Sequence, residues 1–250
     1  RAQVARALTH LQAGKIKALW IACTNPAQSL PDQNAVRAAL AACPFVVLQE
    51  AFRTTETAAY ADLLLPAASW GEKDGTVTNS ERRVSHVRRA INPPGEARAD
   101  WAITVDFAQR LERRLRPGLP SLFAFEQAAQ LFDEFKPLTQ GRDLDMSGIS
   151  HGLLDQLGPQ QWPFPEGAQA GTSRLYTDGI FPTDSGRARF VAEPYRAAKE
   201  QRDARFPLTL ITGRLRDQWH GMSRTGTAAQ LFGHVNEALL SLHPDELRRH

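Results

Sequence analysis

The sequence predicts an α/β fold, a doubly wound and mostly parallel sheet domain followed by the start of a β-rich, barrel-like domain. Three observations support this prediction. Short apolar runs, typical of buried parallel strands, occur at residues 18–22, 45–48 and 62–65. Segments with helical periodicity separate these runs, which is the element order of a doubly wound sheet. Extended patterns then return much later in the chain, at residues 187–191 and 208–212.

The helices between these strands follow from their periodicity and their end signals. Residues 4–12 have helical spacing of apolar side chains and stop before Gly14, a residue suited to a helix C-terminus. Two further helices are expected at residues 32–42 and 55–60. Ligands bind beyond the carboxyl ends of parallel strands. The segments that we expect on this functional edge follow Ala22, Leu48 and Leu65.

The rest of the chain combines a hairpin, helices and a long connection. Asp74-Gly75 is a turn signal flanked by extended patterns at residues 76–78 and 83–87, which indicates a hairpin or an extended loop. A helix that Asp100 could cap is expected to reach about residue 115. Two more helices are expected at residues 125–135 and 149–157. The predicted domains are residues 1–140 (α/β), 141–205 (a connecting segment) and 206–250 (the truncated start of the β-rich domain).

The composition excludes several classes of protein. A net charge of +3 does not indicate a bulk nucleic-acid binder. No apolar run approaches the roughly 20 residues of a membrane span. Cys23 and Cys43 do not form a metal-binding pattern, so we expect no iron–sulfur cluster within these residues. Few cysteines and no export signal favour the cytoplasm. The chain begins at Arg1 and ends soon after a helix signal at Pro244, so we expect an internal fragment.

Three polar segments have the chemistry of a ligand site: residues 23–32, 70–83 and 212–224. They offer hydroxyl groups, amides and guanidinium groups, and backbone N–H groups at a helix start suit an anion. Each segment also has a simpler interpretation, respectively a capped turn, a solvated hairpin and an exposed basic loop. The chain has 25 Arg and 5 Lys, which suits bidentate phosphate binding but also fits a genome with Arg-rich codon usage. Common dinucleotide and P-loop motifs are absent.

In their order along the chain, these segments resemble the molybdopterin oxidoreductases that carry molybdenum on two molybdopterin guanine dinucleotides. The resemblance includes a Thr-Asn-Pro loop at 24–26, the Gly-Glu-Lys-Asp-Gly segment at 71–75 and Ala-Asp-Trp at 99–101. It ends in Thr-Gly-Arg-Leu-Arg-Asp-Gln-Trp-His at 212–220, and it is weak between residues 116 and 170. The ending is most similar to that of assimilatory nitrate reductases. The family thus implies that the β-rich domain binds cofactor.

The resemblance implies a set of cofactor-binding positions. Asn25, and Gln49 with Glu50, match positions near a guanosine portion, although relatives often have Asp at the latter pair. Lys73 and Asp100 match further cofactor positions, and a carboxylate suits the paired donors of guanine. The longest matching run would surround pyrophosphate and pterin, and consists of Thr212, Gly213, Arg214, Leu215, Arg216, Asp217, Gln218, Trp219, His220 and Gly221. No catalytic residue is assigned, but Arg224 could attract substrate.

The implied reaction is two-electron reduction of nitrate to nitrite by oxygen-atom transfer, with an electron-donor protein or reductase subunit as partner. The molybdenum-ligating Cys and the cysteines of a [4Fe-4S] cluster are expected upstream of Arg1. The resemblance therefore implies that the isolated fragment holds no metal through its own side chains and is inactive. Cys23 is not their equivalent and is expected to be a small buried residue. Two rivals stay open: a formate dehydrogenase of the same family and a non-catalytic α/β interaction module. A cofactor-free relative, such as the one in respiratory complex I, loses the polar segments that are present here.

Overall fold

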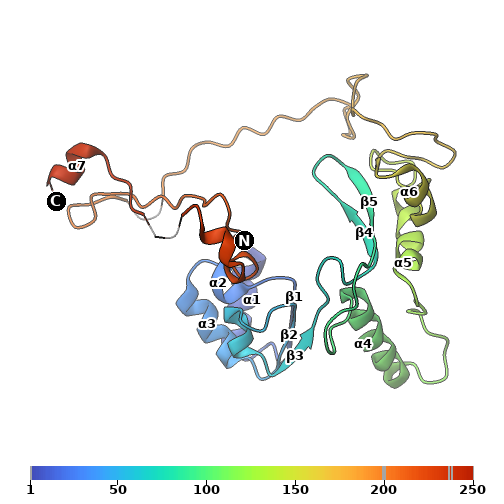
Figure 1. Ribbon diagram of the computed structural model, residues 1–250, viewed down its shortest axis with the longest axis horizontal. Coiled ribbons are helices and arrows are strands. Elements are labelled where there is room, and N and C mark those ends of the chain that lie inside the picture. Colours follow the sequence, from blue (N-terminus) through green and yellow to red (C-terminus); the bar gives the residue numbers. More distant parts are fainter. Residues whose placement is uncertain (1, 199–200, 236, 238, 250) are drawn as a thin grey trace. The chain divides into compact units, whose positions relative to one another are not determined.

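The computed structural model describes residues 2–198, 201–235, 237 and 239–249. The chain forms two compact units. The first contains residues up to Leu64 and those from Tyr195 onward, and the second runs from Leu65 to Pro194. Both units appear in Figure 1. No helix among the described residues is long and apolar enough to cross a membrane.

The first unit is built around a three-stranded sheet of order β1-β2-β3. β1 (Leu19–Ala22) pairs in parallel with β2 (Val46–Glu50). The register places Leu19 opposite Val46 and Ala22 opposite Gln49. The remaining elements of this unit's N-terminal part are α1 (Ala2–Gln12), α2 (Pro26–Ser29), α3 (Gln33–Ala42), the 3-10 helix η1 (Glu56–Tyr60) and β3 (Leu63–Pro66).

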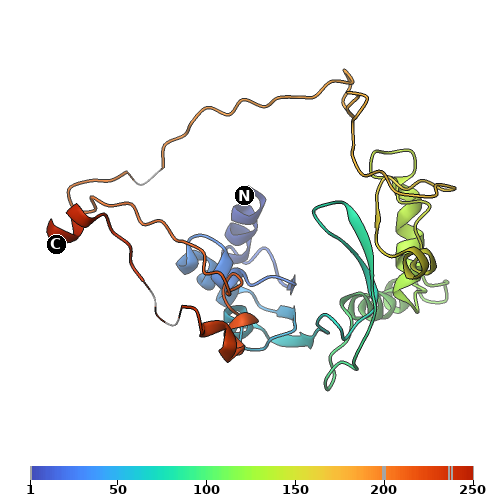
Figure 2. The same ribbon diagram turned by 45° about the horizontal axis from the view of Figure 1, so that its top comes forward.

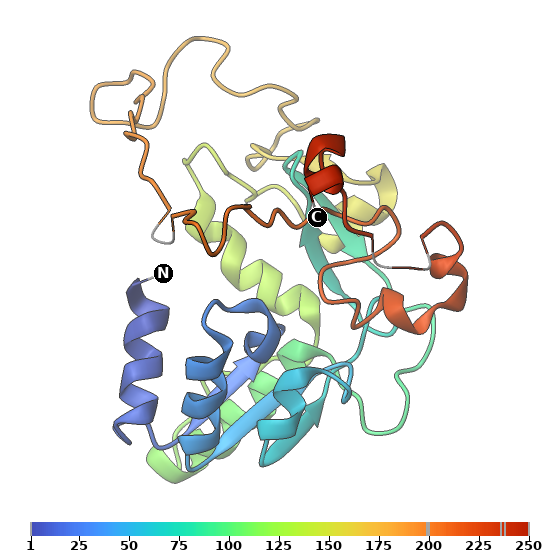
Figure 3. The same cartoon turned by 90° about the vertical axis from the view of Figure 1, so that its left-hand side faces the viewer.

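Apolar periodicity explains how α3 packs. Val36, Ala39 and Leu40 are buried, and their spacing places them on one face of the helix. This face joins the core that contains Ile21 and Leu48 of the sheet. α1 lies beside α3, as Figure 3 shows, and the two helices are in contact. Asp32 begins α3, because its side chain accepts a hydrogen bond from the backbone N–H of Ala35 at 3.3 Å.

The second unit combines an antiparallel sheet with helices. β4 (Gly75–Thr78), β5 (Arg83–Val87) and β6 (Gln160–Gln161) form a sheet of order β4-β5-β6. The helices are α4 (Asp100–Leu115), α5 (Ala128–Phe135), η2 (Lys136–Thr139) and α6 (His151–Leu157). The green hairpin of β4 and β5 runs beside the yellow-green helices α5 and α6 in Figure 2, and these elements are in contact. Their shared core consists of Val84, Phe132, Met146, Ile149, Leu154 and Phe164.

Most of the predicted elements are confirmed: a mixed α/β arrangement with a parallel pair of strands, the hairpin, and the predicted helices of both units. The hairpin turns at residues 79–82, and Gly75 instead begins β4. Asn79 makes this turn, because its Oδ1 accepts hydrogen bonds from the backbone N–H groups of Glu81 and Arg83. Arg82 completes the turn with a left-handed backbone, at a φ of 64°.

The prediction of strands at residues 187–191 and 208–212 is wrong. Neither segment pairs with another, and the described residues from 206 onward contain no strand. They form η3 (Thr225–Thr227), η4 (Ala229–Phe232) and α7 (Pro244–Arg249) instead. A strand requires backbone partners, and the described residues supply none for these segments. Leu210 and Ile211 are consequently 80% and 84% exposed. The predicted domain boundaries stay predictions.

A buried carboxylate holds the loop that leads into α6. Asp145 is 6% exposed, and it accepts hydrogen bonds from the hydroxyl group of Ser147 at 2.6 Å and from the backbone N–H groups of Ser147 and Gly141. Burial alone raises the pKa of Asp145. The hydrogen bonds outweigh burial, because they favour the charged form, and the net pKa lies below its ordinary value of 3.8.

We predict that Asp145→Asn lowers the free energy of unfolding at pH 7. The substitution should also make the free energy of unfolding less dependent on pH in the acid range. The folded pKa lies below the unfolded one, so the stabilisation is complete above about pH 3.8 and is lost as pH falls through the folded pKa. Urea unfolding at several pH values between 2 and 7 measures this change. Asp184→Asn, at an exposed position, is the control. Equal acid sensitivity of wild type and Asp145→Asn would contradict the assignment.

Candidate functional site

The loop after β1 is held by Asn25. Its Oδ1 accepts hydrogen bonds from the backbone N–H and the hydroxyl group of Thr57, at 3.1 and 2.6 Å. Its Nδ2 donates to the Glu56 carboxylate at 2.6 Å. Thr57 is fully buried and its hydroxyl oxygen also accepts from the backbone N–H of Ala27. The Thr-Asn-Pro loop therefore takes its shape from η1, which lies thirty residues further along the chain.

The end of β2 lies at the same edge of the sheet as this loop. Ala22 pairs with Gln49, and the backbone N–H of Cys23 donates to the Gln49 carbonyl at 3.4 Å. Gln49 is 3% exposed, whereas Glu50 is half-buried. Oε1 of Glu50 accepts from the backbone N–H groups of the next two residues, at 2.8 and 3.3 Å. The shared edge predicted for the segments after the first two strands is confirmed.

Cys23 differs from its prediction, because it is exposed rather than buried. It follows the last residue of β1 and has a left-handed backbone, with a φ of 57°. That conformation turns the chain out of the sheet at this position. Cys43, in contrast, is buried in the core of the first unit.

Residues 212–221 form a loop of the first unit whose polar side chains divide into two kinds. Asp217 and Gln218 shape the loop internally: Asp217 pairs with His234 at 2.5 Å, and Gln218 accepts from the Thr225 hydroxyl at 2.7 Å. Those that stay exposed and can face a ligand are Arg214, Arg216, Trp219 and His220. The rings of Trp219 and His220 meet edge to face, with centroids 4.5 Å apart.

One contact joins this loop to the loop after β1. The side-chain amide of Gln28 on α2 donates to the Gly221 carbonyl at 3.4 Å, and it also lies 3.5 Å from the Glu56 carboxylate. Gln28 further accepts from Asn25 at 3.3 Å. The structure thus brings together two of the three polar segments, which are nearly two hundred residues apart in the sequence. Sequence reasoning missed Gln28, Glu56 and Thr57, because side chains that position a loop carry no motif of their own.

Lys73 and Asp100 form the second group of predicted site residues. The Lys73 ammonium group lies 2.6 Å from Oδ2 of Asp100, and both side chains are partly buried. Asp100 is the first residue of α4 and Ala99 is the cap, so the predicted capping role of Asp100 is wrong. A carboxylate in the first helical turn still interacts favourably with the helix dipole. A surface pocket beside this pair is lined by Lys73, Asp74, Gly75, Thr76, Asp100, Trp101, Ala128, Leu131, Phe132 and Phe135.

Arg82, in the same polar segment, has a structural role. Its guanidinium group donates to the Thr172 carbonyl at 3.1 Å and to the Ser173 carbonyl at 2.8 Å, and it also bonds the carbonyl of Trp162. It stacks over the Trp162 ring at 5.3 Å from the centroid. The predicted positions therefore form two groups. Asn25, Gln49, Glu50 and residues 212–221 lie in the first unit, and Lys73 and Asp100 lie in the second.

Comparison with known proteins gives consistent matches. Residues 1–110 match the family model described as molybdopterin oxidoreductase. The chain is 43% identical over 230 residues to a nitrate reductase of Synechocystis, covering 90% of this chain and 30% of that protein. It is 39% identical over 234 residues to the assimilatory nitrate reductase catalytic subunit of Bacillus subtilis, covering 92% of this chain and 32% of the relative.

Two further likenesses set the limits of this comparison. An F420-dependent formate dehydrogenase subunit alpha of Methanocaldococcus jannaschii is 37% identical over 238 residues, covering 95% of this chain and 33% of that protein. The solved structure of acetylene hydratase from Pelobacter acetylenicus matches with a TM-score of 0.51 and 18% identity. That match covers 73% of this chain and 23% of the hydratase, and it shows the fold alone. The chain spans about a third of the length of these curated relatives.

We predict that Asn25→Asp lowers the free energy of unfolding by about 1–2 kcal/mol, because it replaces a donor with a carboxylate beside Glu56. Adding Glu56→Gln should restore part of this loss, since the new amide can donate to the new carboxylate. Denaturant unfolding of both variants measures the coupling.

Asn79→Asp is the matched control, because Asn79 uses its oxygen to accept two backbone hydrogen bonds and an aspartate keeps that oxygen. A similar loss of unfolding free energy in Asn25→Asp and Asn79→Asp would show that the contact with Glu56 does not hold the loop.

Proposed function

We propose that the chain is a cofactor-binding portion of a molybdenum-dependent nitrate reductase of the molybdopterin oxidoreductase family, whose model matches residues 1–110. The reaction is the two-electron reduction of nitrate to nitrite by oxygen-atom transfer. The observation that carries this proposal is identity of 39–43% to nitrate reductases over at least nine-tenths of the chain. Formate dehydrogenase is the second candidate, since a relative of that name is 37% identical over a similar length.

We further propose molybdenum bound by two molybdopterin guanine dinucleotides as the cofactor, with a [4Fe-4S] cluster held by upstream residues. Bound molybdenum would supply the two electrons and accept the oxygen atom. The donor set of the first unit fits the organic part of such a cofactor. The guanidinium group of Arg214 is exposed, and none of the described carboxylates pairs with it, so it offers a fork of donors to a pyrophosphate.

Carboxylates at two positions fit the guanine base. The N1–H and exocyclic amine of guanine form a paired donor edge, which a carboxylate accepts. Both backbone hydrogen bonds of Glu50 use Oε1. Neither of these two bonds uses Oε2, so we propose Oε2 as the oxygen that would accept from guanine. Asp100 uses Oδ2 toward Lys73. In the first unit, the flat rings of Trp219 and His220 are exposed for contact with pterin or guanine.

The hydrogen bonds of the Asn25 side chain favour a positioning role for this residue. Its oxygen and its amide both bond within the protein, to Thr57 and Glu56. We therefore propose that Asn25 positions the loop, and that backbone groups of the loop approach the guanosine portion. Gln49 is buried, so a direct contact is better served by Glu50.

The remaining parts of the proposal concern the whole enzyme. We propose that residues 206–250 belong to a β-rich cofactor-binding domain, since their exposed apolar side chains, including Leu210 and Ile211, suit pairing and burial against further chain. Nitrate is the proposed substrate, an electron-donor protein or reductase subunit the proposed partner, and the cytoplasm the proposed location. No nucleic acid or membrane partner is proposed.

We predict that the purified enzyme carrying this chain contains molybdenum, reduces nitrate with a reduced dye, and does not oxidise formate. In the same assay, Arg224→Ala should raise the KM for nitrate several-fold with little change in kcat, because the exposed Arg224 cation attracts the anion. Arg205→Ala, which removes another exposed cation of the first unit, is the matched control.

Formate oxidation without nitrate reduction would select the dehydrogenase instead. Protein without molybdenum by elemental analysis would overturn both enzyme assignments and leave the interaction module. An unchanged KM for nitrate in Arg224→Ala would contradict the role of Arg224 in attracting substrate, but it would not contradict the proposed nitrate reductase function.

A further inference from the structure

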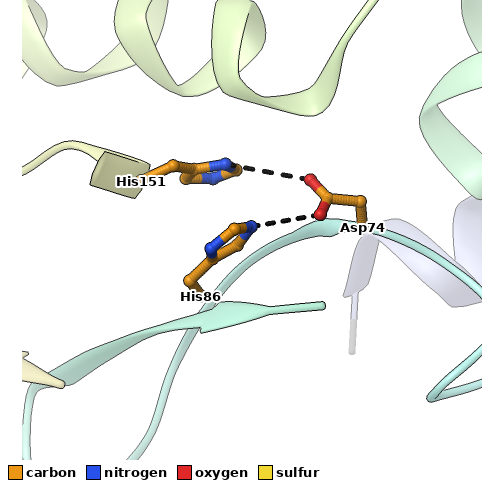
Figure 4. Close-up of side chains that lie close together, drawn as sticks. All are labelled: Asp74, His86 and His151. Carbon is orange, nitrogen blue, oxygen red and sulfur yellow. Dashed lines mark hydrogen bonds and ion pairs between the residues drawn. The ribbon is translucent and has the colours of Figure 1, made fainter. Parts of the chain in front are cut away.

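Asp74, His86 and His151 come together in the second unit. Asp74 directly precedes β4, His86 lies on β5, and His151 is the first residue of α6. Both imidazole rings point toward the same carboxylate, as Figure 4 shows. We propose that these three residues bind a divalent transition metal ion of the Zn²⁺ type. This proposal does not depend on the proposed nitrate reductase activity.

The distances suit one small ion between the three side chains. Nε2 of His86 lies 3.1 Å from Oδ2 of Asp74, and Nδ1 of His151 lies 3.8 Å from Oδ1 of the same carboxylate. All three ligand atoms lie within 4.8 Å of one another. Ligand atoms around a tetrahedral Zn²⁺ are about 3.3 Å apart, so side-chain movements on the order of 1 Å complete the geometry.

The second nitrogen of each ring has its own partner. Nδ1 of His86 lies 2.8 Å from Oδ1 of Asp155, and Nε2 of His151 lies 2.7 Å from the Thr76 hydroxyl group. Histidines that bind metals commonly use their other ring nitrogen in this way, because the partner sets the tautomer and the ring orientation. The ring nitrogens that a metal would use are the two that face Asp74, and at His86 the ion would replace the hydrogen bond between Nε2 and Oδ2 of Asp74.

The two imidazole rings are held in place by their surroundings. Their side chains are only 10% and 12% exposed, and the rings stack with centroids 4.0 Å apart. The ligand nitrogens are therefore already positioned before an ion binds.

Hydrogen bonds to Asp74 and Asp155 account for the position of His86, but they do not account for the orientation of His151. The distance of 3.8 Å between His151 and Asp74 exceeds a hydrogen bond, although the ring is turned toward the carboxylate. An ion between them would satisfy both groups. Asp74 is 49% exposed, which leaves a path from solvent and room for a water ligand. Two imidazoles and one carboxylate suit Zn²⁺ and its neighbours in the first transition series, rather than Mg²⁺ or Ca²⁺.

The proposed ion would fasten the hairpin to α6. Asp74 directly follows Lys73, so occupancy would also fix the turn that presents Lys73. The prediction of no metal on the chain's own side chains came from the resemblance, which places the known metal ligands upstream of Arg1, and no spacing motif in the sequence indicated another metal site. These ligands lie at positions 74, 86 and 151, and only the packing of β5 against α6 brings them together.

The test measures Zn²⁺ binding to the chelator-treated protein by isothermal titration calorimetry. Wild type should bind one equivalent of Zn²⁺ that the double variant His86→Gln/His151→Gln does not bind. Co²⁺ in the same site should give the visible absorption of a tetrahedral complex. His243→Gln, which removes an exposed histidine outside the cluster, should bind like wild type.

Two conservative variants keep the test decisive if the double variant unfolds. Asp155→Asn should weaken Zn²⁺ binding about 10- to 100-fold, because it removes the partner of a ligand and not the ligand itself. Asp74→Asn, at an exposed position, should abolish it, while far-UV circular dichroism stays the same as in wild type. The proposal is overturned if wild type binds no Zn²⁺, or if Asp74→Asn, with the wild-type spectrum, binds it with the wild-type affinity.

Discussion

Parallel pairing of β1 with β2 is the constraint on which the first unit depends. Parallel strands end at the same edge, so the register that places Ala22 opposite Gln49 also places the loop after β1 beside Glu50. The apolar faces of α1 and α3 cover this sheet and bury Leu48 completely. Polar groups are consequently gathered where the strands end, and the backbone there is free to turn outward. The chemistry of the candidate site follows from this one geometrical fact.

Loops at such an edge need separate support, because they have no sheet partners. Here the support comes from polar side chains, of which Thr57 is fully buried. Thr57 and Asn25 hold the first loop against η1, and Gln28 joins it to residues 212–221 through Gly221. The groups left exposed by this arrangement are cationic and aromatic, which suits an anionic dinucleotide with flat ring systems. Positioning and binding are therefore performed by different residues in the same loops.

Periodicity predicted the local structure well and the long-range contacts poorly. The apolar faces of α1, α3 and α4 and the runs of the first three strands are local patterns, so they could be read from the sequence. The strand expected at residues 208–212 has the right composition, but strand formation depends on a partner and not on composition alone. Asp100 has a residue type that is common at helix caps. The helix, however, begins at Asp100 itself, and Ala99 is the cap.

The candidate site shows the same division. Lys73 and Asp100 were predicted separately by resemblance, and their ion pair at 2.6 Å appears only in three dimensions. Glu56, Thr57 and the histidine cluster were missed, because their roles depend on contacts with residues that are distant in the sequence. Cys23 was expected to be buried on the basis of residue type, but its left-handed backbone exposes it. Residue type alone therefore did not predict whether this side chain is exposed.

Hydrogen–deuterium exchange of the protein with and without the proposed molybdopterin cofactor tests the central claim most directly. The account predicts slower exchange of backbone amides in residues 24–28, 50–52 and 212–221 when cofactor is bound, with α5 unchanged as an internal reference. Equal exchange in residues 212–221 of both forms would contradict the claim that this segment holds the cofactor.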